Sequence, residues 1–267
     1  METIYKNSQK KEHRSIPNYA VFDSVFYKDL PKVTKIYPLP YEYYKKYGIQ
    51  RFGFHGISHQ YVTESILRRH KNAKKIITVH LGSGCSMTAT KNGHPIDTSM
   101  GFTPLEGLMM LTRSGNVDAG IIHYLVERGY ISHRGIDPML NFESGMIGVS
   151  GLETDMMNFL HIAGYKVENP EFKPQISPRN LSEEDIERVK LALDMFVYRV
   201  KKFIGEYYAV LGGLDVLAFT GRIGFGSAVI RNKILKGLEH ITKDAVIEAV
   251  ETDEELQIAK EIIKTMQ

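Results

Sequence analysis

A glycine-rich turn after an apolar, β-type run is the first feature of the sequence that could bind a ligand. Residues 75–81 form the run, Gly82, Ser83 and Gly84 form the turn, and a second β-type stretch leads to the Asn92–Gly93 turn. Glycines let backbone N–H groups approach an anion closely, because no Cβ intervenes. The spacing matches neither the dinucleotide fingerprint nor the P-loop. The pattern therefore indicates a strand, loop and hairpin that either bind phosphate or form a plain tight turn.

Two cationic or proton-donating side chains lie in small-residue surroundings that suit anion chemistry. His55 stands between aromatic residues and glycines in Phe-Gly-Phe-His-Gly, where an imidazole could donate to developing negative charge. Arg113 stands in Leu-Thr-Arg-Ser-Gly, and its planar guanidinium suits carboxylate or phosphate. The alternatives are a packed, hydrogen-bonded histidine and a surface arginine.

Two carboxylates occupy positions where catalytic or metal-binding groups often occur. Asp23 follows a short apolar run at residues 19–22, and Glu254 lies in the acidic stretch 253–255 at the start of the last predicted helix. Carboxylate oxygens are the ligands that Mg²⁺ prefers. Asp23 could equally cap a turn, and Glu254 could simply stabilise the positive end of a helix dipole.

Composition excludes several classes of protein. The chain has 267 residues, a formal net charge of +3 and one cysteine, Cys85, which we expect to be a small packing residue. The charge is too small to indicate a nucleic-acid or membrane partner, and no apolar run reaches the roughly 18 residues of a membrane span. A single cysteine allows no internal disulfide and fits a reducing compartment, so we expect a cytoplasmic protein.

The elements that must position these residues alternate between strand and helix patterns. Residues 181–211 give the strongest helix, with Ser182 as N-cap and one apolar face. Residues 215–220 form a buried-type strand that runs into a second glycine cluster at Gly221, Gly224 and Gly226. This alternation indicates an α/β fold, in which ligands lie at the carboxyl ends of strands. We therefore expect two glycine loops that face one ligand. The other expected helices cover about 59–69, 118–127, 132–141, 152–161, 227–238 and 253–265, and a last strand covers 246–250.

Longer motifs resemble the C-terminal part of the acetate kinase family. The similarity covers nearly all of residues 17–267, and its most specific block is residues 97–110. The matching stretches are residues 21–24, 37–41, 52–59, 80–84, 97–110, 112–115, 148–151 and 201–207.

The resemblance implies an actin-like ATPase (ribonuclease H-like) superfamily fold, with a mixed sheet flanked by helices. It implies Mg²⁺-dependent, reversible phosphoryl transfer from ATP to acetate, giving acetyl phosphate and ADP. The implied catalytic residues are Asp23, His55 and Arg113, the implied Mg²⁺ residue is Glu254, and Phe54 and Pro104 would line the acetate pocket. The implied nucleotide- and phosphate-binding residues are His80, Leu81, Gly82, Ser83, Gly84, Asp155, Met156, Met157, Gly221, Arg222, Ile223, Gly224 and Phe225.

The resemblance also implies a division of the chain. Residues 1–23 would be a remnant of an N-terminal domain, 24–250 the C-terminal nucleotide-binding kinase domain, and 251–267 a helix that packs on the missing N-terminal domain. We therefore expect little activity from the chain alone, and a homodimer or association with a separately encoded N-terminal domain.

The nucleotide loop departs from the family pattern. The usual Phe-Thr-Ala-Gly-Ile-Gly-Glu-Asn-Ser is here residues 219–227, in which Arg222 replaces a glycine beside adenosine and Phe225 replaces the acidic residue. Near Asp155 the usual arginine is lost. Besides an acetate kinase, these departures leave two hypotheses open: a catalytically dead paralogue or split-enzyme subunit that acts by protein binding, and a kinase that uses another donor, such as pyrophosphate.

Overall fold

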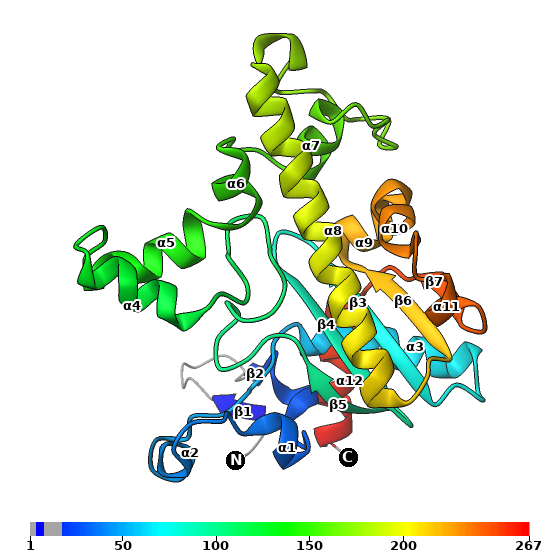
Figure 1. Cartoon of the computed structure of the whole chain (residues 1–267). Helices are drawn as coiled ribbons and strands as arrows, with labels where there is room; N and C mark the ends of the chain where they lie inside the picture. Colours follow the sequence, from blue (N-terminus) through cyan, green and yellow to red (C-terminus); the bar gives the residue numbers. More distant parts are fainter. Residues whose placement is uncertain (1–3, 8–17, 267) are drawn as a thin grey trace, which may run out of the picture.

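The centre of the molecule is a five-stranded mixed sheet with the order β5-β4-β3-β6-β7 (Figure 1). The computed structural model describes residues 4–7 and 18–266. The hairpin β3–β4 and the pair β4–β5 are antiparallel, whereas β6 pairs in parallel with both β3 and β7. The strands are β3 (Lys75–Leu81), β4 (Cys85–Lys91), β5 (His94–Thr98), β6 (Val216–Thr220) and β7 (Val246–Ala249).

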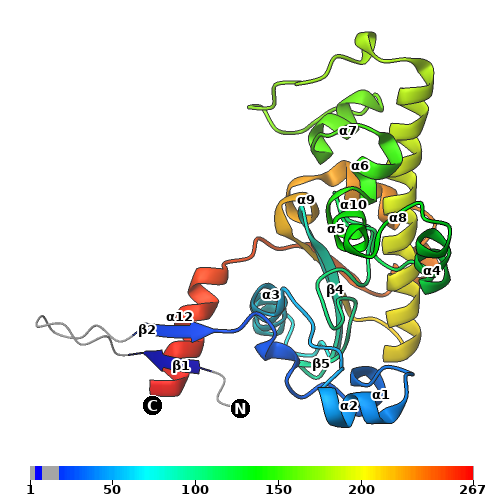
Figure 2. The same cartoon turned by 90° about the vertical axis from the view of Figure 1, so that its left-hand side faces the viewer.

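Helices cover both faces of this sheet. The long helix α8 (Glu183–Leu211) lies on one face, and α3 (Gly56–Arg69) lies on the other with α12 (Glu254–Met266) beside it (Figure 2). The larger apolar core lies between α8 and the sheet, and a smaller one lies under α3. The carboxyl ends of β3 and β6, which are neighbouring parallel strands, therefore meet at one edge of the sheet.

Helix α8 confirms the strongest sequence prediction. The Ser182 hydroxyl accepts from the Asp185 N–H, and the Asp185 carboxylate accepts from the Ser182 N–H, which makes a capping box. Gly212 ends the helix in the left-handed conformation with φ of 67°. The apolar positions spaced at 3.6 residues, from Val189 to Tyr207, are buried.

The second glycine cluster is a helix, and the prediction of a loop was wrong. Residues Gly221–Gly226 form α9 directly after β6. A Cβ on Gly221, whose φ is +75°, would lie 2.7 Å from the Leu81 carbonyl oxygen, and one on Gly224 would lie 3.3 Å from that of Val79. Close packing on the end of β3 therefore outweighs the cost of glycine in a helix, about 1 kcal/mol per residue.

Two other helices begin later than predicted, because side-chain N-caps fix their first residues. Helix α7 (Met156–Ile162) begins four residues later than expected, since the Asp155 side chain accepts from the Asn158 N–H. Helix α10 (Ala228–Leu235) begins after Ser227, whose hydroxyl accepts from the Ile230 N–H. The remaining elements are β1 (Ile4–Asn7), β2 (Asn18–Val21), η1 (Val25–Tyr27), α1 (Lys32–Lys35), α2 (Tyr41–Tyr47), α4 (Ala119–Glu127), η2 (His133–Gly135), α5 (Ile136–Phe142), α6 (Gly145–Ser150), η3 (Pro178–Asn180) and α11 (Glu239–Thr242).

The C-terminal helix α12 packs on α3 and beside β2. Its other side exposes Leu256, Ile263 and Met266. It stays a prediction that a further domain covers that side of α12. The division of the chain at residues 23 and 250 also stays a prediction. None of the helices in the described residues has the length and apolarity needed to cross a membrane.

Candidate active site

The β3–β4 turn presents its glycines at the carboxyl edge of the sheet. The turn is tight, because the Gly82 N–H donates to the Gly84 carbonyl at 3.0 Å. The Leu111 N–H donates to the Ser83 carbonyl at 3.3 Å, which fastens the turn to the segment that leads to Arg113. Ser83 itself is exposed.

His55 is held at the start of α3 in an uncommon conformation. It is the N-cap of the helix and has a φ of 55°, in the left-handed region that non-glycine residues seldom adopt. Its N–H donates to an Asp23 carboxylate oxygen at 2.6 Å, and the Gly56 N–H donates to the Asp23 carbonyl at 2.9 Å. The predicted catalytic carboxylate therefore also clamps the strained backbone of the predicted catalytic histidine.

His55 and Arg113 converge over Gly84. A Cβ on Gly84 would lie 3.2 Å from Cε1 and 3.3 Å from Nε2 of His55, and 3.5 Å from Nη1 of Arg113. Because Gly84 has no Cβ, an imidazole nitrogen and a guanidinium can both lie close to the backbone of the turn. An anion of phosphoryl size is the group that such donors suit.

The two residues predicted to line the acetate pocket adjoin this cluster. Arg113 Nη1 donates to the Pro104 carbonyl at 3.3 Å. Phe54 directly precedes His55, and its carbonyl accepts from the Tyr27 hydroxyl at 3.3 Å. The structure thus brings together four segments that are far apart in the sequence. The acetate-binding role of Phe54 and Pro104 stays a prediction.

Glu254 lies at the N-terminus of α12, on the Asp23 side of the cluster. Burial raises the pKa of its carboxyl group, and the neighbouring charge of Asp23 raises it further. Within the described part of the chain, no group of three or more His, Cys, Asp and Glu side chains could hold a metal ion. A pair of carboxylates is nevertheless typical of Mg²⁺, which is usually bound by one or two of them together with substrate phosphates and water.

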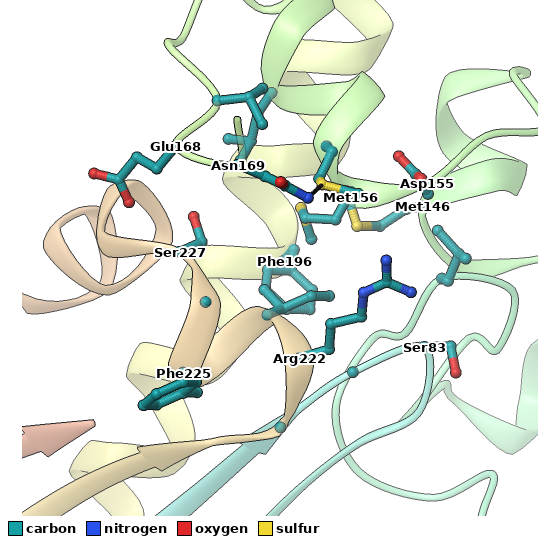
Figure 3. A pocket seen from close by; sticks show the side chains of 18 of the residues that line it. Ser83, Met146, Asp155, Met156, Glu168, Asn169, Phe196, Arg222, Phe225 and Ser227 are labelled. Atoms are coloured by element: carbon teal, nitrogen blue, oxygen red, sulfur yellow. Dashed lines mark hydrogen bonds between the residues drawn. The ribbon is translucent and has the colours of Figure 1, made fainter. Parts of the chain in front are cut away.

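A cavity of about 640 Å³ lies beside the turn, between α7, α8 and α9 (Figure 3). Arg222 reaches into the middle of it from α9, between Ser83 and Met156 (Figure 3). Among the side chains drawn, the one hydrogen bond joins the Asn169 amide to the Met157 sulfur, so none of them holds the guanidinium. The predicted nucleotide-site residues that line the cavity are Gly82, Ser83, Asp155, Met156, Met157, Gly221, Arg222, Ile223 and Phe225.

The other predicted phosphate-site residues lie outside that lining. Leu81 and Gly224 are buried where α9 packs on β3. His80 stacks on His55 with 4.4 Å between the ring centroids, and its Nδ1 is 2.8 Å from the Ser58 hydroxyl. Burial, with a smaller effect of His55, lowers the pKa of His80 to about 3. His80 is therefore neutral near pH 7.

Sequence reasoning missed two groups of residues. His59, Thr78 and Ser86 connect to the His55 ring through buried hydrogen bonds. His59 stood inside a motif already noted, but nothing local predicts that Ser86, on the next strand, reaches it. Lys166 and Glu168 line the cavity from the loop after α7, which no pattern connected to the site.

Comparison with known proteins finds acetate kinases and a propionate kinase among the relatives of this chain. A sequence model of the acetokinase family matches residues 2–262. An acetate kinase of Lawsonia intracellularis is 42% identical over 92% of this chain and 62% of its own length. An acetate kinase of Thermoanaerobacterium thermosaccharolyticum is 46% identical over 85% of this chain and 53% of its own length.

Solved structures agree with the sequence relatives. Porphyromonas gingivalis acetate kinase superposes with a TM-score of 0.81 at 34% identity, over 94% of this chain and 65% of that one. A propionate kinase from Francisella tularensis superposes with a TM-score of 0.80 at 35% identity, over 92% of this chain and 64% of that one. The predicted actin-like ATPase fold, a mixed sheet flanked by helices, is thus confirmed. The chain spans less than two thirds of the length of these relatives.

Proposed function

The chain belongs to the acetokinase family, and from that premise we propose that it supplies the phosphoryl-transfer site of a carboxylate kinase. The observation that carries the proposal is the convergence of His55 and Arg113 over Gly84, next to the Gly82–Ser83 edge of the cavity. One side of the turn would then bind the phosphoryl donor and the other the acceptor.

The proposed reaction is reversible transfer of a phosphoryl group from ATP to acetate. The bond between the γ-phosphorus and the bridging oxygen of ATP breaks, and a bond from an acetate oxygen to that phosphorus forms, giving ADP and acetyl phosphate. Charge on the equatorial oxygens must be stabilised while donor and acceptor stay in line. Arg113 and the His55 ring would stabilise that charge, and Asp23 fixes the backbone from which His55 projects.

The acceptor would lie on the side of Phe54 and Pro104. Both adjoin the charged cluster, so a carboxylate could be oriented there by its charge and its alkyl group. The relatives include an acetate kinase and a propionate kinase at nearly equal identity. We propose acetate, with propionate as the comparison substrate in the assay.

Mg²⁺ fits the acidic side of the cluster. Glu254, with its pKa raised by burial and by Asp23, is a carboxylate that a cation would stabilise in the charged form. When bound, the ion would neutralise charge on the donor phosphates. We propose Glu254 as its protein ligand. Glu254→Gln should therefore weaken Mg²⁺-dependent nucleotide binding, which calorimetry can measure with and without the ion.

The position of Arg222 favours a second candidate donor. Its guanidinium occupies space in the cavity where a nucleoside would lie. A cation there suits a bare phosphate chain, because guanidinium groups bind phosphate in a fork geometry. Pyrophosphate is therefore the alternative donor, and a chain that only binds ligand or protein is the third hypothesis.

The hydroxamate assay for acyl phosphate separates these functions. Purified chain is incubated with Mg²⁺, acetate or propionate, and either ATP or pyrophosphate, alone and with the N-terminal third of a relative added in trans. We expect turnover on the order of 1–100 s⁻¹ in the complemented reaction, as for other kinases, and little from the chain alone. No turnover with either donor in any combination would contradict the kinase proposal and favour a binding function.

The donor is tested by Arg222→Gly, with Lys166→Ala as a matched control that removes another cation from the same cavity. If Arg222 excludes adenosine by its bulk, Arg222→Gly strengthens ATP binding and weakens pyrophosphate binding in calorimetry. Lys166→Ala should weaken both, because it removes a cation from the lining of the cavity. Equal changes in the two variants would contradict a shape-based donor choice.

Exposed apolar side chains support the expected self-association. Ile121 and Tyr124 are exposed on α4, which with α5 extends away from the sheet (Figure 1), and Leu256 and Ile263 are exposed on α12. We propose a homodimer. Sedimentation at several concentrations tests it, and a monomer throughout would contradict it.

A further inference from the structure

A chain of buried hydrogen bonds runs from the His55 ring into the core. The Ser86 hydroxyl lies 2.8 Å from His55 Nδ1 and 2.7 Å from His59 Nε2. The other ring nitrogen of His59, Nδ1, lies 2.6 Å from the Thr78 hydroxyl. His59, Thr78 and Ser86 are all fully buried, so water does not complete these bonds.

The single hydrogen of the Ser86 hydroxyl couples the two imidazoles. That hydroxyl can donate to one ring nitrogen and must accept from the other. If Ser86 donates to His59, both neutral rings carry their proton on Nδ1. If Ser86 donates to His55, both carry it on Nε2. The two histidines therefore share one tautomer, and the far end of the chain decides which.

Distances at Thr78 favour the Nε2–H form. Thr78 Oγ1 lies 2.6 Å from His59 Nδ1, close enough for the Thr78 hydroxyl to donate to that nitrogen. The competing acceptor of the Thr78 hydroxyl, the Thr88 carbonyl, is 3.4 Å away. Thr78 therefore donates to His59 Nδ1, His59 Nε2–H donates to Ser86, and Ser86 donates to His55 Nδ1.

We propose that His59 and Ser86 are positioning residues that hold neutral His55 with its proton on Nε2, directed at the space over Gly84. The role of that proton, a hydrogen bond to the transferring phosphoryl group, rests on the proposed function. The tautomer itself does not. A neutral imidazole can donate in this way only when its Nδ1 is an acceptor, and the Ser86 hydroxyl satisfies that condition.

The charges around His55 are compatible with a neutral ring. Burial lowers the pKa of His55, the Asp23 carboxylate opposes that shift, and Arg113 adds to it. Burial also lowers the pKa of His59 well below its ordinary value, with contributions from His80 and His55. The groups that face the His55 ring are thus Asp23, Arg113, His59 and His80.

Ring-nitrogen NMR of the full chain tests the tautomer without any need for activity. Long-range proton–nitrogen spectra of histidine-labelled protein, recorded at about pH 8, above the ordinary histidine pKa of about 6.5, distinguish protonated from unprotonated nitrogens. His55→Gln assigns the His55 signals. We expect Nδ1 unprotonated and Nε2 protonated in both His55 and His59. A His55 that carries its proton on Nδ1 would overturn the proposal.

Two serine variants test the cause. Ser86→Ala should replace the single His55 tautomer by a mixture. Ser58→Ala is the matched control, because it removes a hydroxyl at the same 2.8 Å distance from His80 Nδ1. The control should change the signals of His80 and leave those of His55. A single, unchanged His55 tautomer in folded Ser86→Ala would count against the relay.

Kinetics of the complemented enzyme give the second readout. Ser86→Ala should lower kcat by roughly 10²-fold, the loss seen when one oxyanion-hole donor is removed, with KM for acetate little changed. A neutral donor also predicts that kcat does not decline as pH rises through about 6.5. Such a decline, lost in His55→Gln, would overturn the proposal. If His55 shows the Nε2–H tautomer but the complemented enzyme has no turnover, the role of Ser86 and His59 is supported. That result would contradict only the proposed kinase function.

Discussion

Replacing Arg51 by methionine should unfold the chain at distinctly lower denaturant, because one guanidinium joins three segments beside the site. Its Nη1 donates to the carbonyls of Thr98 and Met100, each at 3.0 Å. Its Nε donates to the Thr34 carbonyl at 3.2 Å, and its Nη2 pairs with Glu106 at 2.6 Å. These bonds tie the end of β5 and Glu106 to the chain around α1.

The expected loss is about 3–4 kcal/mol of unfolding free energy. Each carbonyl that loses its partner costs about 1 kcal/mol net, and a charged partner is worth somewhat more. The Arg51 side chain is 16% exposed and that of Glu106 is 29% exposed, so water partly replaces the ion pair. We therefore assign that pair only about 1 kcal/mol. Methionine keeps the length of the apolar stem, which limits any cavity.

Urea unfolding followed by circular dichroism measures the change. With a slope of about 2–3 kcal/mol per M, the midpoint should fall by about 1–2 M. Arg69→Met is the matched control, because Arg69 pairs with Glu248 but is 46% exposed, and it should cost less than about 1 kcal/mol. Equal losses in the two variants would refute the assignment of a structural role to the Arg51 bonds.

The remaining predictions concern burial, capping and glycine. His80 has a pKa of about 3 in the fold and about 6.5 when unfolded, so the unfolded state binds its proton first as pH falls. The unfolding free energy should therefore drop below about pH 6.5 by up to 1.4 kcal/mol per pH unit from this group, and an unchanged slope in His80→Gln would contradict this. Ser182→Ala should cost about 1 kcal/mol in urea unfolding through loss of the capping box, and no measurable loss would argue against the cap. Gly205→Ala, with open space around its Cβ, should stabilise α8 by about 0.5–1 kcal/mol. Gly221→Ala should instead lower the unfolding free energy by more than about 2 kcal/mol. The opposite order of the two variants in thermal unfolding would refute the packing argument for α9.

Local patterns in the sequence correctly predicted much of the fold. The β3–β4 hairpin follows from two β-type runs joined by glycines, and α8 follows from a 3.6-residue apolar period with a Ser182 cap. These signals are reliable because the interactions that produce them lie within a few residues along the chain. Helix α9 was missed for the opposite reason. Its glycines disfavour a helix locally, and only their close contact with the end of β3 makes one stable.

By itself, the sequence determined the family, the order of most strands and helices, and the candidate residues of the site. Contiguous motifs such as residues 97–110 are sufficient for that, because each can be recognised without knowing what it touches. Only the tertiary structure decided that His55 and Arg113 meet over Gly84, that Arg222 reaches into the neighbouring cavity, and that Ser86 links two histidines. These contacts join residues far apart in the chain, and their geometry depends on how α3 and α9 pack on the end of β3.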